Sequence, residues 1–171
     1  MGNKRLYIIR IAYAGLIAAL YLVITLFTSP ISYGPVQFRI AEALNILPLF
    51  FPEAILGLTI GCFISNIFSP GIVLLDMTIG TSATLISAIL CYFIGKTIKK
   101  ESLKVIIAII PCIVINAIFT PFTFLALTEL KELYFIQLLW ILLGQIGVLT
   151  IIGIPFYYTL KSLDKRYHLF F

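Results

Sequence analysis

Two acidic residues stand within long apolar stretches of this sequence, Glu42 in residues 40–51 and Asp76 in residues 72–95. An ionisable side chain inside a membrane-spanning segment is costly, so its presence indicates a functional site. Carboxylates accept hydrogen bonds from ring N–H and amino groups. The sequence therefore predicts that Glu42 and Asp76 recognise a ligand.

Arg39 and Asn45 flank Glu42 at a spacing of three residues on each side. At 100° per residue, an α-helix places these three side chains within about 120° of one another, on one side. A second interpretation stays open, in which Arg39 and Glu42 form a salt bridge that pins a loop to the helix end.

Gly80, Ala83 and Ser87 follow Asp76 at helical spacing. They form a small, weakly polar stripe of the kind that faces protein and not lipid. Asp76 also follows Pro70 and Gly71, so a first-turn acid that interacts favourably with the helix dipole is an alternative.

Amides and one tryptophan extend the set of polar side chains in apolar stretches. Carboxylates, paired amides and an aromatic ring suit a planar heterocycle, a cationic amine, or a guanine-like ring that bears an amine. The additional candidates are Asn66, Asn116, Trp140 and Gln145.

The composition excludes a water-soluble fold. Of the 171 residues, 61% are hydrophobic and 11% are charged, whereas soluble domains carry about 25% charged residues. About 20 residues are needed for each membrane span. The chain is thus expected to be one transmembrane domain, residues 1–171, with no room for a nucleotide-hydrolysing domain. Energy for uphill transport would have to come from an ion gradient or from a partner chain.

The hydrophobic stretches predict an all-α integral membrane bundle of six transmembrane helices. The stretches are residues 7–27, 40–51, 54–68, 72–95, 105–127 and 133–160. The second and third stretches could instead form one kinked helix. Six spans with both termini cytoplasmic place ten of the twelve Lys and Arg residues inside, as the positive-inside rule favours. The third helix is expected to be short, with Pro52 and Glu53 at the inner interface.

This topology places the polar candidates in the outer half of the membrane, which predicts a pocket that opens outward. A pathway for ions would need polar groups at every depth.

Small residues mark the helix contacts. Gly57 and Gly61 form a GxxxG pair, for which internal packing is expected. Ala14 and Ala18, with Gly15 and Ala19 beside them, give the first helix a small face that either packs internally or docks on another membrane protein.

The sequence offers little for catalysis. Cys62, Cys91 and Cys112 lie in apolar stretches at spacings that match no metal or redox motif. They are interpreted as small buried hydrophobic residues. The HExxH and GxSxG patterns are missing from the sequence, so we expect neither an enzyme nor a bound cofactor.

Residues 37–44, Gln-Phe-Arg-Ile-Ala-Glu-Ala-Leu, are the most specific part of a resemblance that extends over nearly the whole chain. Together with Pro48, residues 57–62, Asn66, residues 75–76 and Gly80, they resemble the QueT family of energy-coupling-factor (ECF) transporter substrate-binding subunits. The resemblance implies a six-helix subunit of the cell membrane that binds a queuosine precursor or salvage base, a 7-deazaguanine, and no nucleic acid. It also implies two kinds of partner, a transmembrane coupling subunit that docks on Ala14 and Ala18, and two cytoplasmic ATPases.

We expect these residues to divide the work of recognition. Glu42 and Asp76 would accept from ring N–H and amino groups, Asn66 and Asn116 would read the ligand through their amides, and Arg39 would orient Glu42. The remaining substrate-binding candidates are Asn45, Trp140 and Gln145, and residues 28–38 would close over the pocket. Two alternatives are a binding subunit for another vitamin-like heterocycle and a small membrane channel or assembly protein that transports nothing.

Overall fold

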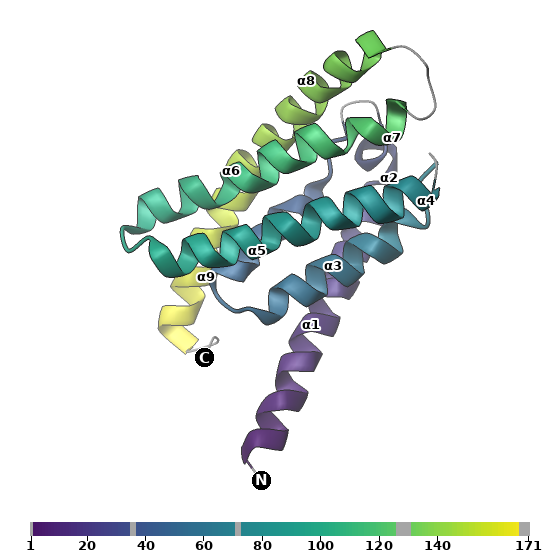
Figure 1. The fold of residues 1–171 in the computed structure, drawn as a ribbon. Helices are drawn as coiled ribbons and strands as arrows, with labels where there is room; N and C mark the ends of the chain where they lie inside the picture. The colour runs from purple at the N-terminus through teal and green to yellow at the C-terminus, as the bar shows by residue number, and fades with distance from the viewer. Residues whose placement is uncertain (1, 35–36, 71–72, 126–130, 168–171) are drawn as a thin grey trace.

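A computed structural model describes residues 2–34, 37–70, 73–125 and 131–167, and every regular element within them is helical. This confirms the predicted all-α class for the described part of the chain. The elements, labelled in Figure 1 where space allows, are α1 (Gly2–Phe27), α2 (Ser29–Ser32), η1 (Ile40–Leu49), α3 (Glu53–Asn66), α4 (Val73–Leu75), η2 (Asp76–Gly80), α5 (Thr81–Thr97), α6 (Glu101–Phe119), α7 (Pro121–Leu125), α8 (Lys131–Val148), η3 (Leu149–Gly153) and α9 (Ile154–Tyr167).

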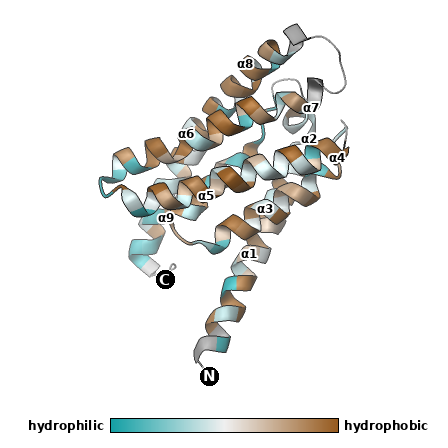
Figure 2. Cartoon of the chain, in the orientation of Figure 1, coloured by the Kyte–Doolittle hydropathy of each residue, from teal (hydrophilic) through white to brown (hydrophobic). Residues whose placement is uncertain are grey.

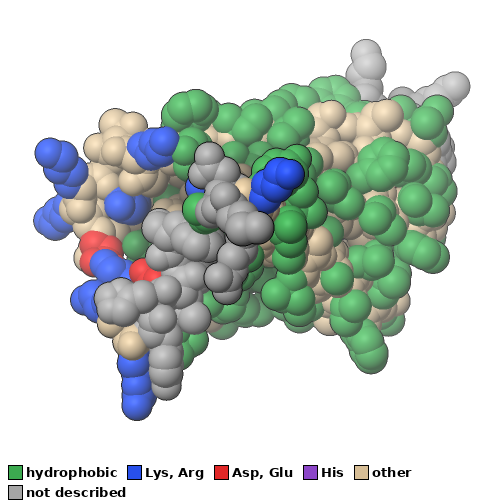
Figure 3. Space-filling view, turned by 90° about the horizontal axis from the view of Figure 1, so that it is seen from below, with side chains coloured by type: hydrophobic (Ala, Val, Ile, Leu, Met, Phe, Trp, Pro, Cys, Tyr) green, Lys and Arg blue, Asp and Glu red, His purple; other side chains and the backbone are tan. Residues whose placement is uncertain are grey.

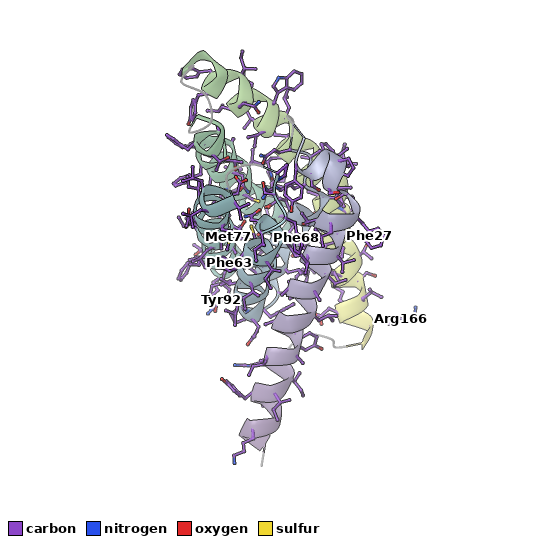
Figure 4. The ribbon with its side chains drawn as sticks, turned by 90° about the vertical axis from the view of Figure 1, so that its right-hand side faces the viewer. Phe27, Phe63, Phe68, Met77, Tyr92 and Arg166 are labelled. Atoms are coloured by element: carbon purple, nitrogen blue, oxygen red, sulfur yellow. The ribbon has the colours of Figure 1, made fainter. Side chains whose placement is uncertain are left out.

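Four helical segments are long and apolar enough to cross a membrane, so the chain is a multi-pass membrane protein. They are Leu6–Phe27, Val73–Thr97, Glu101–Thr123 and Tyr134–Arg166. The last contains α8, η3 and α9, and the second contains α4, η2 and α5. Large hydrophobic side chains cover their outer surfaces, including Phe27, which is 86% exposed and points away from the body of the molecule (Figure 4). An exposed apolar surface of this extent is suited to lipid.

The other two predicted spans, residues 40–51 and 54–68, are too short to cross the membrane. The first is a 3₁₀-helix of 10 residues, η1, and the second is an α-helix of 14 residues, α3. At rises of about 2.0 and 1.5 Å per residue, each is about 20 Å long, against a hydrocarbon thickness of about 30 Å. Of the six predicted transmembrane helices, four are thus confirmed as long enough to span a membrane; the third is short, as expected, and the second is short as well.

A parallel contact joins α1 to α3. Arg10 Nε lies 3.1 Å from Glu53 Oε1, and two further contacts follow at steps of four residues on both helices, Ala14 with Gly57 and Ala18 with Gly61. Since both helices run in the same direction, the chain must return between them.

The returning segment is η1, and it forms a hairpin with α3. In its first turn, Glu42 accepts a hydrogen bond from Tyr21, in the second half of α1. Just after its last residue, Phe51 packs against Tyr13, earlier in α1, with 5.8 Å between the ring centroids. Hence η1 runs opposite to α1 and α3. The alternative of one kinked helix over residues 40–68 is wrong.

Close approach of α1 and α3 depends on the two glycines. A Cβ atom at Gly57 would lie 2.6 Å from the Ala14 carbonyl oxygen, and one at Gly61 would lie 2.9 Å from that of Ala18. The expected internal packing of the glycine pair is confirmed. Ala14 and Ala18, which form the α1 side of this contact, are buried, with exposed fractions of 5% and 9%.

The core is built around η1. Residues 41–48 of this helix are all buried, and two apolar clusters flank it. One includes Tyr21, Leu44, Leu47 and Leu58, and the other includes Ile46, Val105, Ile109 and Leu149. Figure 2 shows hydrophobic residues along most of the surrounding helices, with hydrophilic residues concentrated at the α5–α6 turn and the end of α9.

Basic side chains gather at one end of the molecule. Figure 3 shows Lys and Arg at the end where α5 turns into α6, while hydrophobic side chains predominate over much of the rest of that face. An ion pair between Lys161 and Glu101 ties α9 to this end, and the rings of Phe50 and Tyr157 add a contact at 5.0 Å between centroids. The loop after η1, the α5–α6 turn and α9 thus lie together. That this end faces the cytoplasm stays a prediction.

We predict that Gly57→Ala destabilises the protein by about 1–3 kcal/mol, because its Cβ would displace the backbone of α1. Gly15→Ala is the matched control, since a Cβ atom there meets nothing within 4 Å. It should leave stability unchanged or raise it by up to about 1 kcal/mol, owing to the better helix propensity of alanine. Thermal unfolding in detergent measures both, and equal midpoints for the two variants would contradict the α1–α3 contact.

Candidate functional site

The carboxylate of Glu42 lies at the centre of a buried hydrogen-bond network. The Tyr21 hydroxyl donates to its Oε1 atom at 2.5 Å. The side-chain amides of Asn45 and Asn116 donate to its Oε2 atom, the latter at 3.3 Å. Glu42 is 1% exposed. A buried carboxylate requires donors of this kind, because an unsatisfied charge in a medium of low polarity costs several kcal/mol.

The 3₁₀ geometry of η1 aligns Glu42 with Asn45. A 3₁₀-helix has three residues per turn, so side chains at positions i and i+3 stand directly above one another. An α-helix would separate them by about 60°. The predicted shared face of Glu42 and Asn45 is confirmed, and the tighter helix brings them into direct contact.

A thiol extends this network towards α8. Cys112 Sγ lies 3.3 Å from Asn45 Nδ2 and 3.5 Å from Glu42 Oε2. Gln145 Oε1 lies 4.0 Å from the same sulfur, and the Gln145 side chain is buried. The structure thus brings together four predicted site residues from η1, α6 and α8, namely Glu42, Asn45, Asn116 and Gln145.

A second buried group of polar side chains joins α3 to η2. Asn66 Nδ2 donates to the Asp76 carbonyl oxygen at 2.8 Å, and Ser69 Oγ donates to the Asp76 carboxylate. Gly80 is required for this approach, because a Cβ atom there would lie 2.9 Å from Asn66 Nδ2. Asp76 begins a π-helical turn, a feature frequent at functional sites.

The thiol of Cys62 connects the two groups. It lies 3.2 Å from Thr84 Oγ1 and 3.5 Å from Asn66 Nδ2, and it interacts with Tyr21, which in turn binds Glu42. We call the combined set the polar core: Tyr21, Arg39, Glu42, Asn45, Cys62, Asn66, Asp76, Thr84, Cys112, Asn116 and Gln145.

Arg39 belongs to the polar core without forming an ion pair among the described residues. Its side chain is buried, and its Cζ atom lies 5.6 Å from the ring centroid of Tyr33. No hydrogen bond or salt bridge joins it to Glu42 within the described part of the chain, although the two interact electrostatically. Tyr21, Asn45 and Asn116 make the direct hydrogen bonds to the carboxylate, and the expected orientation of Glu42 by Arg39 stays a prediction.

The backbone before Arg39 is strained. Gln37 is buried and has a φ angle of 45°, which residues other than glycine adopt at a cost of about 1–3 kcal/mol. Its carbonyl oxygen accepts the Arg39 N–H at 2.8 Å. Strain of this kind is concentrated at functional sites, and here it lies two residues before the buried Arg39.

A surface groove of about 360 Å³ lies next to Tyr33. Ser29, Pro30, Tyr33, Phe68 and Pro70 line it. The Tyr33 hydroxyl donates to the Ser65 carbonyl oxygen at 2.5 Å. Burial raises the pKa of this hydroxyl above its usual value, so it remains a neutral donor. Through Tyr33, the groove adjoins Arg39 at the edge of the polar core.

Other predicted site residues lie outside the polar core. Trp140 is 47% exposed on α8, so the structure does not bring it to the site. Ala14 and Ala18 are covered by α3, whereas Gly15 and Ala19 beside them are exposed. Part of the predicted closing loop, residues 35–36, lies outside the described residues, and Ser29–Ser32 form a helical turn within it.

The sequence analysis missed four members of the polar core, Tyr21, Cys62, Thr84 and Cys112. Burial of the two cysteines is confirmed, but both have polar partners. A signal was present: each cysteine precedes an asparagine by four residues, as Cys62–Asn66 and Cys112–Asn116, and each pair lies 3.5 Å apart. Tyr21 follows Ala18 by three residues and shares its buried face.

The chemistry that this arrangement supports is recognition. Among the described residues, no group of three or more His, Cys, Asp and Glu side chains could hold a metal ion. The polar core combines two carboxylates, side-chain amides that can both donate and accept hydrogen bonds, and the cation of Arg39, all inside an apolar bundle. Such a set is chemically suited to a polar, planar small molecule with defined donors and acceptors.

Comparisons with known proteins agree with this interpretation. The family model described as QueT transporter matches residues 11–162. A protein of Lactococcus lactis subsp. cremoris (strain MG1363), described as queuosine precursor transporter QueT, is 42% identical over 73 residues. That alignment covers 42% of this chain and 42% of the relative, so it spans less than half of the relative's length. No solved structure gives a significant match.

We predict that Tyr21→Phe lowers the free energy of unfolding by about 1.5–3 kcal/mol, because it removes a donor from a buried carboxylate. Tyr7→Phe is the control in the same helix, since Tyr7 is 68% exposed, and its effect should stay within about 0.5 kcal/mol. Chemical denaturation in detergent measures both variants. If Tyr21→Phe proves as stable as Tyr7→Phe, the Tyr21–Glu42 hydrogen bond does not hold the carboxylate.

Proposed function

Because this chain belongs to the QueT transporter family, we propose that it is the substrate-binding subunit of an ECF-type importer for a queuosine precursor or salvage base. The substrate class would be a 7-deazaguanine, such as the 7-aminomethyl derivative or queuine. The protein is a transport subunit and performs no chemistry on its substrate. Its membrane would be the cytoplasmic membrane, with the basic end inside.

The polar core is the observation that carries the proposal. A guanine-type ring presents N–H and amino donors next to a carbonyl acceptor, and carboxylates and amides are the side chains that pair with such an edge. Glu42 and Asn45 come from η1, Asn116 from α6, and Asn66 and Asp76 from α3 and η2. These four segments are therefore joined through polar side chains, at a cost in burial that a purely structural bundle would avoid.

The carboxylates of Glu42 and Asp76 can each accept a further hydrogen bond from a ligand. Glu42 Oε1 accepts from one described donor, Tyr21, and the Asp76 side chain accepts from Ser69. A carboxylate oxygen has two lone pairs. A ring N–H or an amino group can therefore be added without removing a donor that the protein already supplies.

Access from outside would pass the groove beside Tyr33. This groove lies at the α2 segment, at the end of α1 opposite to Arg10 and Glu53. In the proposed cycle, the ligand enters here and residues 28–38 close over it.

Transport would require partner chains. We propose a transmembrane coupling subunit and two cytoplasmic ATPases, whose ATP hydrolysis reorients the binding subunit so that it releases the substrate inward. Since α3 covers Ala14 and Ala18, the docking surface would be the adjacent exposed side of α1, which carries Gly15 and Ala19. Small residues allow another helix to approach closely.

We predict that Glu42→Gln and Glu42→Ala weaken binding of 7-aminomethyl-7-deazaguanine and of queuine by about 30-fold or more, because charged hydrogen bonds contribute about 1.5–3 kcal/mol each. Calorimetric titration of the detergent-solubilised protein measures the affinity, and gel filtration shows whether each variant is folded. Wild-type affinity in a folded Glu42 variant would rule out this site.

Trp140→Ala is the matched control for the Glu42 variants, because Trp140 is an exposed aromatic residue outside the polar core, and its affinity should equal that of the wild type. Guanine, riboflavin, thiamine and biotin complete the ligand panel. Tighter binding of one of these would assign the chain to another heterocycle. Failure to bind any of them, with no ATPase co-purifying, would favour a protein that transports nothing.

We also predict that Gly15→Leu combined with Ala19→Leu abolishes co-purification of the coupling subunit and ATPases while ligand affinity is retained. Two leucines would hold an incoming helix several ångströms away. Ser82→Leu, on the exposed face of α5, is the control and should leave co-purification unchanged. Intact assembly in the α1 double variant would place the docking surface elsewhere.

A further inference from the structure

Three buried polar atoms in the polar core have no hydrogen-bond partner in the described part of the chain. They are Arg39 Nε, Asn45 Oδ1 and Asn66 Oδ1. The side chains that carry them are 6%, 3% and 0% exposed. Nearly all buried polar groups in native proteins are paired, so each exception requires an explanation. A ligand that supplies the missing partners is the simplest one.

The side chains that carry the three atoms are linked through neighbours in the polar core. Asn45 donates through its amide nitrogen to Glu42, and Asn66 approaches Cys62 in the same way. The Arg39 guanidinium interacts electrostatically with both Glu42 and Cys62, and with Tyr21 between them. Arg39 therefore lies beside both groups of the polar core. The side-chain NH2 groups of the two asparagines donate to other protein atoms, whereas their side-chain oxygens have no donor in the described part of the chain.

The three unpaired atoms include both hydrogen-bond acceptors and a donor. Asn45 Oδ1 and Asn66 Oδ1 are acceptors, whereas Arg39 Nε carries a donor. Their complement is a ligand edge with one acceptor and at least two donors. The 6-oxo, N1–H and 2-amino groups of a guanine-type ring have this composition.

We infer that Arg39 contacts the substrate directly and donates from Nε to the exocyclic oxygen of a 6-oxo heterocycle, while Asn45 and Asn66 accept from its N–H and amino groups. This inference rests on the proposed function and deepens it, because it assigns the oxygen of the ring to one side chain. Arg39 is then a specificity-determining residue. Tyr33, at 5.6 Å from the guanidinium carbon, helps to hold it in place.

The experiment combines a change in the ligand with a change in the residue. 7-Deazaguanine is compared with its 6-thio analogue, which keeps N1–H and the 2-amino group but has a weaker acceptor. The residue change is Arg39→Lys, which keeps the charge and places a methylene where Nε stands. Calorimetric titration gives the ratio of the two affinities for each protein.

The wild type should bind the oxo ligand about tenfold or more tightly than the thio ligand, as expected for a hydrogen bond from a charged donor. In Arg39→Lys the ratio should fall to about threefold or less. If Arg39→Lys does not fold, Arg39→Met provides the same comparison with the donor removed. An unchanged ratio, with both affinities reduced equally, would show that Arg39 acts only through the structure and would overturn the inference.

7-Deazahypoxanthine, which lacks the 2-amino group, is the control ligand. Its loss of affinity relative to 7-deazaguanine should be the same in the wild type and in Arg39→Lys, since the acceptors of Asn45 and Asn66 are unchanged. If Arg39→Lys binds 7-deazahypoxanthine as tightly as 7-deazaguanine, the assignment of the 2-amino group to the asparagines is contradicted. If the wild type binds none of the deazapurines, the proposed function fails, and the inference fails with it. Wild-type binding without a difference between oxo and thio ligands overturns the inference alone.

Discussion

The burial of the Glu42 carboxylate within an apolar bundle is the constraint on which the rest of this structure depends. A charge in that position requires hydrogen-bond donors, and they must come from neighbouring helices because η1 supplies only Asn45. Tyr21 of α1 and Asn116 of α6 meet this need. The carboxylate thereby ties α1 and α6 to η1 through hydrogen bonds.

The unusual features of the backbone serve the same arrangement. Gly57 and Gly61 let α1 approach α3, and this brings Tyr21 within reach of Glu42. The 3₁₀ form of η1 stacks Glu42 on Asn45, although runs of this helix beyond four residues are uncommon. Gly80 makes room for the Asn66 amide. Each of these features therefore occurs where a polar side chain has to be positioned.

Much of this could be predicted from the sequence, because hydropathy and charge are local properties. The helical class, the burial of Glu42, Asn66 and Asp76, and the packing of the glycine pair follow from composition and spacing. The form and length of η1 do not, because a run of ten mostly apolar residues is compatible with either helix type. The pairing of Tyr21 with Glu42 spans 21 residues, and no local pattern reveals which donor a buried acid selects. Trp140 was assigned to the site by residue type, but its place on α8 faces outward.

Tyr21 also provides a physical connection between the two ends of the proposed mechanism. It follows Ala19, on the exposed side of α1 proposed for docking, by two residues, and its hydroxyl donates to the carboxylate proposed to receive the ligand. A ligand that forms a hydrogen bond with Glu42 would weaken or strengthen the Tyr21–Glu42 hydrogen bond. It would thereby change the interaction that holds α1 against η1. By linkage, a partner that shifts α1 must change ligand affinity to the same extent. Coupling between substrate binding and assembly therefore needs no long pathway here, because one side chain contacts the site from the helix that would dock.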